Sequence, residues 1–203
     1  MIRLLIADDQ ALVRGALAAL LGLERDIEVI AEVGRGDEVV GAALESTPDV
    51  ALLDVDMPGL DGIAAAALLK KALPACQVLM VTTFGRPGYL RRAMQAGASG
   101  FVVKDTPARQ LADAVRRVAS GLRVVDPLLA AETLTSGDSP LTERETDVLS
   151  AARARGSIAD IARSLHLSEG TVRNYLSSAI GKTNARNRAD AVTIAEENGW
   201  LPA

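Results

Sequence analysis

The sequence predicts a doubly wound α/β domain with a five-stranded parallel sheet, followed by a small all-helical domain. Two observations lead to this prediction. Short apolar runs alternate with longer amphipathic stretches up to about residue 120, and beyond residue 140 only helical patterns occur. The apolar runs are continuous, as strands buried on both faces of a sheet require. The chain has 203 residues, which is enough for two domains.

Five short runs rich in β-branched or aliphatic residues are the predicted strands. Each is followed by a stretch with helical spacing, and this repeat is typical of a parallel sheet covered by helices on both faces. The runs are Ile2–Ala7, Val29–Val33, Val50–Val55, Val78–Thr82 and Gly100–Val103, and the helical stretches begin near Gln10, Gly36, Asp61, Pro87 and Pro107. We therefore place the α/β domain at residues 1–120.

Turn-forming residues at 136–140 mark an interdomain linker, which we place at residues 121–140. The helical domain then covers residues 141–203. Its helices are expected at about 142–154, 158–165, 169–182 and 188–197. Thr142 and Glu145 fit a capping box at the first of these helices, and Ser168 is placed to N-cap the third.

Charge is distributed unevenly along the chain. The net charge is −4, but residues 140–203 hold eight Lys/Arg and eight Asp/Glu, so the excess of acid lies in residues 1–139. Residues 168–188 contain four cations and a single acid, Glu169, which makes this segment a basic stripe suited to nucleic acid. No apolar run reaches the roughly 20 residues needed to cross a bilayer, and no signal peptide is recognisable. With Cys76 as the single cysteine, expected to fill the core, we predict a cytoplasmic protein without membrane attachment.

Three carboxylates follow predicted strands. Asp8 and Asp9 come after the first strand and Asp54 ends the third, so they meet at the edge where doubly wound sheets bind ligands. Mg²⁺ suits such a cluster, and a carboxylate there can accept a phosphoryl group. Lys104 reaches the same edge to pair with that group, and Thr82 offers it a hydroxyl. For any one of these acids taken alone, a role in capping the next helix is as good an explanation as a role in a binding site.

The N-terminal domain resembles the receiver domains of bacterial response regulators, which have a flavodoxin-like fold. The resemblance rests on Ala7-Asp8-Asp9, Leu53 to Gly59, Asp61-Gly62, Val81-Thr82-Thr83 and Val103-Lys104-Asp105. It implies that a sensor histidine kinase phosphorylates Asp54, and that Asp8, Asp9 and Asp54 bind Mg²⁺ together with the backbone carbonyl of Asp56. It also implies that Lys104 binds the phosphoryl group and that Thr82 and Phe101 form the switch. Asp105 departs from the proline that many receivers have there.

Two other functions fit part of the pattern. Asp54 and Asp56 resemble the paired aspartates of haloacid-dehalogenase phosphatases, but that motif usually follows the first strand, and Asp8 and Asp9 would have no role. A second alternative is that the receiver is an interaction scaffold that works without phosphorylation.

We predict a transcription factor and not an enzyme. The only chemistry expected of it is self-phosphorylation and self-dephosphorylation at Asp54.

The helix from Glu169 has one apolar face and one small, polar, basic face. Positions 172, 175, 176, 179, 180 and 183 are expected to point inward and 173, 174, 177, 178 and 181 outward, so the outward face fits the major groove of duplex DNA. Arg173 is predicted to read guanine and Asn174 adenine, and phosphate contacts are predicted for Lys182, Arg186 and Arg188. On a helix without the helix-turn-helix spacing, the same residues would be merely solvated.

This domain resembles the LuxR/NarL family of helix-turn-helix domains. The resemblance rests on Leu141 to Glu145, Ile158 to Ala162, Leu167-Ser168, Thr171 to Tyr175 and Arg186 to Arg188, and we add Thr171 and Ser177 to the predicted DNA contacts. Tyr175, Gly181 and Thr183 depart from the family pattern. His166, the only histidine, lies in the turn and is predicted to be structural. Residues 82–105, including Phe84 to Tyr89, look most like the branch that regulates membrane-lipid desaturation.

These features predict that phosphorylation drives formation of a homodimer whose two reading helices meet two half-sites of promoter DNA. RNA polymerase is a further candidate partner. Apolar stripes on the first and last receiver helices are candidate dimer faces, although both must also cover the sheet; the C-terminal helix is another. The stripes are Leu12, Ala16, Ala19 and Leu20, and Leu111, Ala114, Val115 and Val118.

Overall fold

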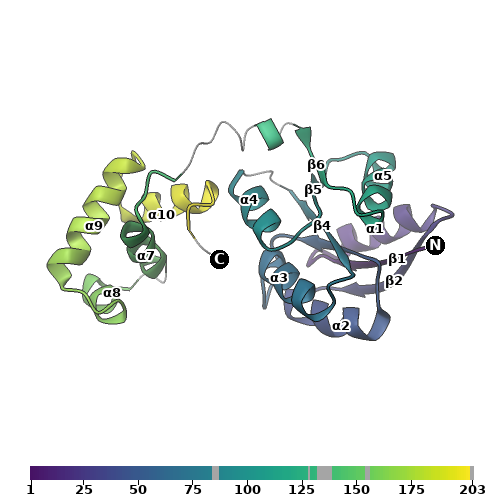
Figure 1. Ribbon diagram of the computed structural model, residues 1–203, viewed down its shortest axis with the longest axis horizontal. Helices are drawn as coiled ribbons and strands as arrows, with labels where there is room; N and C mark the ends of the chain where they lie inside the picture. The colour runs from purple at the N-terminus through teal and green to yellow at the C-terminus, as the bar shows by residue number, and fades with distance from the viewer. Residues whose placement is uncertain (84–86, 128, 132–138, 154–155, 202–203) are drawn as a thin grey trace. The chain divides into compact units, whose positions relative to one another are not determined.

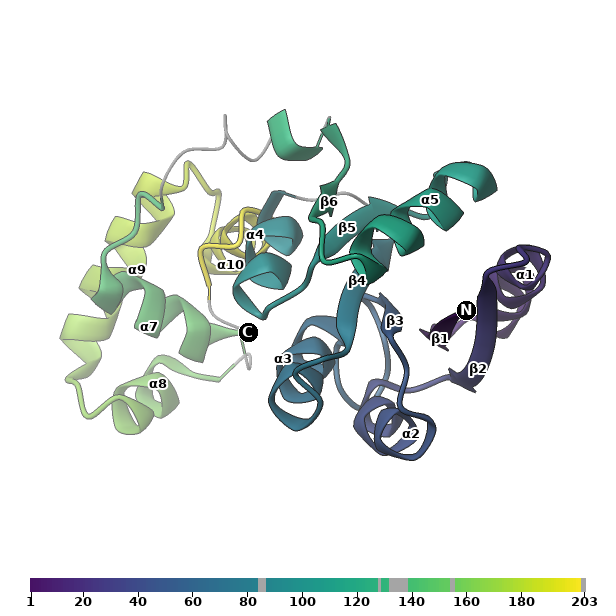
Figure 2. The same ribbon diagram turned by 45° about the vertical axis from the view of Figure 1, so that its right-hand side comes forward.

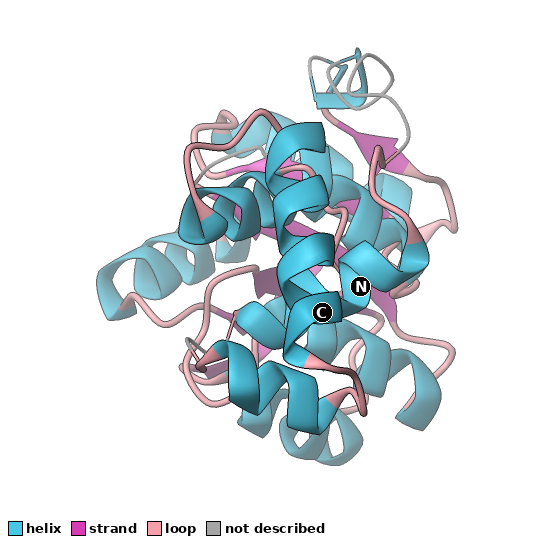
Figure 3. Ribbon diagram, turned by 90° about the vertical axis from the view of Figure 1, so that its left-hand side faces the viewer, coloured by secondary structure: helices cyan, strands magenta, loops and turns pink. Residues whose placement is uncertain are grey.

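The computed structural model describes residues 1–83, 87–127, 129–131, 139–153 and 156–201. The chain divides into two compact units, one comprising most of residues 1–131 and the other most of residues 132–203. Every strand among these described residues, magenta in Figure 3, belongs to the first unit. The two-domain organisation predicted from the sequence, an α/β domain and then a helical one, is confirmed.

The first unit is built on a parallel sheet with strand order β2-β1-β3-β4-β5-β6. This order places β1 and β3 side by side in the interior of the sheet, so the residues that follow them share one edge. The first five strands agree with the predicted runs to within two residues. Their bounds are β1 Ile2–Ala7, β2 Ile27–Val33, β3 Val50–Asp54, β4 Gln77–Thr82 and β5 Gly100–Val103.

Helices cover both faces of the sheet (Figures 1 and 2). On one face lie α1 (Ala11–Gly22) and α5 (Ala108–Ala119); on the other lie the 3₁₀ turn η1 (Gly36–Glu38), α2 (Val39–Ser46), α3 (Gly62–Ala72) and α4 (Pro87–Gln95). Successive strand residues alternate between the two cores because side chains along a strand point to opposite faces. Leu4 and Ile6 enter the core under α1 and α5, whereas Leu5 enters the other, which also holds Cys76.

The prediction of five strands was wrong by one, since Val124–Val125 forms a sixth, β6, within the expected linker. The amide of Val124 donates to the carbonyl of Ser99 at 3.0 Å, and the amide of Asp126 donates to the carbonyl of Phe101 at 3.2 Å. A little farther on, the side chain of Leu129 is buried in the same core as Phe101. β6 forms because β5 offers an unpaired edge, and a strand of two residues has no sequence pattern that would predict it. The start of the expected linker is therefore part of the sheet.

The second unit is a cluster of helices whose bounds agree with the predicted ones to within two residues: α7 Glu143–Ala152, α8 Ile158–Ser164, α9 Glu169–Lys182 and α10 Arg188–Glu197. The capping box of Thr142 and Glu145 is present, and Ser168 caps α9 as predicted. Val148, Val172 and Ala195 are among the residues that join these helices in one core. In the part of the chain that the structure describes, no helix is both long enough and apolar enough to cross a membrane.

Candidate functional site

Three carboxylates converge at the carboxyl edge of the sheet. β1 leads directly into Asp8 and Asp9, and Asp54 is the last residue of the neighbouring β3. One oxygen from each of the three carboxylates lies within 4.8 Å of the other two. Asp8 is 0% exposed and Asp54 is 2% exposed, whereas Asp9 faces solvent. The structure thus brings together the three acids that the sequence predicted to share a site.

Lys104, which follows β5, lies between the two buried acids. Its Nζ is 2.8 Å from Asp8 Oδ2 and 2.9 Å from Asp54 Oδ2. Burial lowers the pKa of Lys104, but the hydrogen bonds with Asp54 and Asp8 outweigh this effect and raise the pKa above its usual value. The ammonium group therefore stays charged at neutral pH, available for an anionic group attached to Asp54.

Burial raises the pKa of Asp54, and the hydrogen bond and charge of Lys104 offset this only in part. Burial also removes water from around the ionised carboxylate, and a nucleophile that has lost part of its hydration shell reacts more readily. The site therefore suits Asp54 as the acceptor of an electrophilic group.

The donor set fits a divalent cation. When ionised, the three acids carry three negative charges, and Lys104 offsets one of them. Carboxylate oxygens are the ligands that Mg²⁺ prefers, and exposed Asp9 leaves room for the waters that this ion retains. The side chain of Asp56 is exposed. The expected coordination of Mg²⁺ by the Asp56 carbonyl stays a prediction.

Close backbone packing shapes the loop after Asp54. A Cβ atom at Gly62 would overlap the carbonyl oxygen of Asp54, so only glycine allows α3 to begin this close to β3. The amide of Gly62 donates to the carbonyl of Val55 at 2.9 Å, and Asp61 caps α3 through the amide of Ala64. The Asp61-Gly62 pair noted in the sequence is thus explained by the start of this helix.

Arg14, a residue of α1, supports the site, although no sequence pattern pointed to it. Its Nη1 donates to the backbone oxygen of Asp8 at 2.6 Å, and its Nε lies 3.7 Å from Glu32. The amide of Gln10 also donates to Asp8 Oδ1, at 2.9 Å. Asp8 is therefore held through its backbone and its side chain, but an arginine in an amphipathic helix carries no signal of such a contact.

The residues expected to form the switch lie on neighbouring strands. Thr82 ends β4 and is fully buried, and its carbonyl accepts a hydrogen bond from the amide of Lys104 at 2.7 Å. Phe101 of β5 is also fully buried, in the core that contains Leu90 and Ala93 of α4. Movement of Phe101 would therefore disturb α4, as the switch role requires, and that role stays a prediction.

In the second unit, α8 and α9 form a helix-turn-helix. His166 adopts the left-handed conformation in the turn, with φ of 54°, and the amide of Leu167 donates to the carbonyl of Ala162 at 2.9 Å. These features support a structural role for His166. On α9 the exposure of the predicted faces is confirmed: positions 172, 176, 179 and 183 are buried and 175 and 180 partly buried, whereas 173, 174, 177, 178 and 181 are exposed. Of the exposed positions, Ser178 also bonds to Glu145 of α7.

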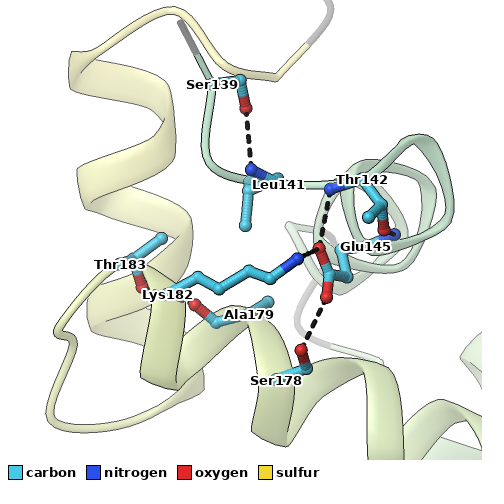
Figure 4. Close-up of polar contacts among 8 residues, drawn as sticks. All are labelled: Ser139, Leu141, Thr142, Glu145, Ser178, Ala179, Lys182 and Thr183. Atoms are coloured by element: carbon cyan, nitrogen blue, oxygen red, sulfur yellow. Dashed lines mark hydrogen bonds and ion pairs between the residues drawn. The ribbon is translucent and has the colours of Figure 1, made fainter. Parts of the chain in front are cut away.

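All four cations predicted to contact DNA have partners within the protein. Arg173 pairs with Glu169 at 2.8 Å and Arg186 with Asp190 at 3.0 Å, both at the surface, where ion pairs are weak and easily exchanged. Arg188 donates to the carbonyl of Gly156 at 2.9 Å. Lys182 differs because its partner, Glu145, is buried (Figure 4); its Nζ is 2.8 Å from Glu145 Oε2.

Comparison with known proteins identifies the family of each of the two domains. Residues 4–116 match the response regulator receiver domain, and residues 139–195 match the bacterial regulatory proteins of the luxR family. Similar curated proteins include the uncharacterized transcriptional regulatory protein YvfU of Bacillus subtilis, 45% identical over 201 residues, with 99% of this chain and 100% of that protein covered. Another is the transcriptional regulatory protein DesR of the same organism, 42% identical with the same coverage.

A crystal structure of response regulator ChrA, from a heme-sensing two-component system, is 32% identical and has a TM-score of 0.60, with 97% of this chain and 96% of that chain covered. In the segment Phe84 to Tyr89, residues 84–86 lie outside the described residues. The narrower resemblance based on that segment stays a prediction. Receiver and luxR-type matches on one chain, together with these relatives, establish that this protein belongs to the response regulators with a LuxR-type DNA-binding domain, a family of transcriptional regulators.

Proposed function

We propose that a sensor histidine kinase phosphorylates this protein at Asp54, and that the phosphorylated chain dimerises and binds duplex DNA at promoters to control transcription. The observation that carries the proposal is the Asp8, Asp54 and Lys104 constellation on the same chain as an exposed basic reading helix. Because the partner is DNA, the protein works in the cytoplasm, and RNA polymerase is a further partner. The test is whether acetyl phosphate with Mg²⁺ converts the chain into a dimer that binds a specific duplex.

The chemistry follows from the positions of three side chains. A carboxylate oxygen of Asp54 attacks the phosphorus of the donor, the bond to the leaving group breaks, and an acyl phosphate forms. Lys104 then exchanges the Asp54 oxygen for a phosphoryl oxygen, and the Thr82 hydroxyl binds another. Asp8 and Asp9 would hold Mg²⁺ with Asp54, and the ion would offset the charge of the transferred group.

Replacing Asp9 by alanine should raise the Mg²⁺ concentration needed for half-maximal phosphorylation by roughly tenfold or more. Loss of a metal ligand should cost at least as much as the 10–100-fold loss in affinity typical of outer-shell partners. Asp9 is exposed, so the fold should survive. Phosphate incorporation from acetyl phosphate over a Mg²⁺ series measures the shift, with Asp113→Ala on α5 as the control. An unchanged Mg²⁺ requirement would mean that the metal is held elsewhere.

The exposed face of α1 is the better of the two proposed receiver dimer faces. Leu12 is 86% exposed and Leu20 is 47% exposed, and the intervening Ala16 and Ala19 also face solvent. On α5, by contrast, the whole stripe is buried against the sheet. Core packing therefore accounts for the α5 stripe, and α1 is left with an apolar surface of the kind that marks an association site.

Leu20→Asp should prevent phosphorylation-dependent dimerisation while leaving phosphorylation of Asp54 unchanged, because a charge would be buried without a partner in the interface. Leu68→Asp is a matched control, since Leu68 is also 47% exposed but lies on α3, across the sheet. Sedimentation of the phosphorylated variants, with circular dichroism as a check on folding, gives the result. If Leu20→Asp still dimerises as the wild type does, this face of α1 is not the interface.

A further inference from the structure

The carboxylate of Glu145 connects the start of α7 to the second half of α9 (Figure 4). Its side chain is buried, and its Oε2 accepts from the amide of Thr142 at 2.6 Å, the bond that completes the capping box. Two further bonds come from α9. Ser178 Oγ donates to Oε1 at 2.6 Å, and Lys182 Nζ donates to Oε2 at 2.8 Å. Capping of α7 does not require these two bonds.

Two contacts to one carboxylate fix the rotation of α9 about its axis. Ser178 and Lys182 are four residues apart and lie on the same face of the helix, one turn from each other. A rotation of roughly 20° would move a side chain at a radius of roughly 5–6 Å by about 2 Å, given the dimensions of an α-helix. Such a shift is large enough to break the hydrogen bonds that Arg173 would make to a base edge.

Glu145 is ionised in the folded protein. Burial raises its pKa, but the hydrogen bonds from Lys182, Ser178 and Thr142 outweigh that effect and give a pKa of about 2. A buried carboxylate without a charged partner is strongly destabilising. Lys182 would leave Glu145 in that state if it turned away to a DNA phosphate. Arg173 would leave an exposed acid, and Arg186 would leave Asp190, whose side chain is 21% exposed.

We infer that Glu145 is a positioning residue for the DNA-reading helix, and that Lys182 is the ion-pair partner of Glu145 and not a phosphate contact. This inference rests on the proposed DNA-binding function. It replaces the phosphate contact expected for Lys182 from its place at the end of α9. In this arrangement Glu145 contributes to sequence preference without touching DNA, through the angle at which α9 presents Arg173 and Asn174.

The test compares Lys182→Gln with Arg186→Gln, the latter being an exposed cation that is still predicted to contact phosphate. The full-length chain, treated with acetyl phosphate and Mg²⁺, is titrated with its preferred duplex and with a random duplex over a series of salt concentrations. Lys182→Gln should lower the ratio of specific to random affinity about tenfold and leave the salt dependence unchanged. Arg186→Gln should weaken both duplexes and reduce the slope of log K against log salt by about 0.9 per phosphate contact.

Glu145→Gln supplies the opposite test. It releases the ammonium group of Lys182, so affinity for random DNA should rise and its salt slope should steepen by up to about 0.9, while the specific-to-random ratio falls. Ser178→Ala removes one bond to Glu145 but leaves the ion pair, so this variant should fold. Its ratio of specific to random affinity should fall a few-fold, and its salt dependence should not change. If Lys182→Gln instead behaves like Arg186→Gln, or if Ser178→Ala leaves the ratio unchanged, the inference is wrong.

Hydrogen exchange separates failure of this inference from failure of the proposed function. A wild-type chain that binds no duplex under any condition would defeat the proposed function. The rates of amide hydrogen exchange in the free protein would then test the positioning role. In Ser178→Ala, protection should fall in the second half of α9 more than in α8 or α10. An even loss over α7 to α10 would show that Glu145 contributes only to overall stability.

Discussion

Asp54→Asn should abolish the incorporation of acid-labile phosphate from acetyl phosphate. An amide is too weak a nucleophile to form an acyl phosphate, so this variant lacks the acceptor that we propose. Intact mass after incubation with the donor and Mg²⁺ measures the loss, which should exceed a hundredfold in rate.

Asp49→Asn is the matched control for this experiment. Asp49 precedes the same strand, β3, at the opposite edge of the sheet, and its carboxylate accepts a hydrogen bond from the amide of Arg3 that asparagine can also accept. Phosphorylation of this variant should equal that of the wild type. One phosphoryl group found on the Asp54→Asn protein would show that another residue is the acceptor.

Arg173→Ala should cost about 1–3 kcal/mol of binding free energy on the preferred duplex and relax base preference at one position. Arg173 is exposed on the outward face near the start of α9, the part of a reading helix that meets base edges. Its pairing with Glu169 is solvent-exposed, so releasing the guanidinium to DNA costs little. Binding isotherms on the preferred duplex and on single-base variants measure the effect.

Arg144→Ala provides the control for Arg173→Ala. The side chains of Arg144 and Arg173 are similarly exposed, at 64% and 58%, and each pairs with an acid on its own helix, but Arg144 belongs to α7. Its loss should change binding to both kinds of duplex by less than the loss of Arg173. Equal weakening of specific and random binding by Arg173→Ala would mean that α9 does not lie in the major groove as we propose.

The sequence could predict whatever depends on local pattern. The first five strands are continuous apolar runs, and the two faces of α9 follow from helical spacing, so both were placed correctly. The acidic site was also predictable, because parallel strands bring their carboxyl ends to one edge and thereby place Asp8 beside Asp54.

Contacts made by distant residues could not be predicted in this way. β6 has only two residues and forms because β5 has a free edge, which no periodicity in Val124-Val125 records. Glu145 was correctly expected to cap its own helix, but its contact with Lys182 joins positions 37 apart in the chain. The stripe on α5 was a candidate dimer face although it also had to cover the sheet, and the structure, where the whole stripe is buried on the sheet, accounts for it by core packing.

The most direct test of the central claim is a footprint on promoter-containing genomic DNA, with and without acetyl phosphate and Mg²⁺, on the wild type and on Asp54→Asn. We expect protection of two half-sites spaced by about one turn of the duplex, appearing at lower protein concentration when the donor is present and only for the wild type. Protection that is indifferent to the donor and to Asp54→Asn would contradict the account and favour a scaffold. Hydrolysis of small phosphate esters without any footprint would favour a phosphatase.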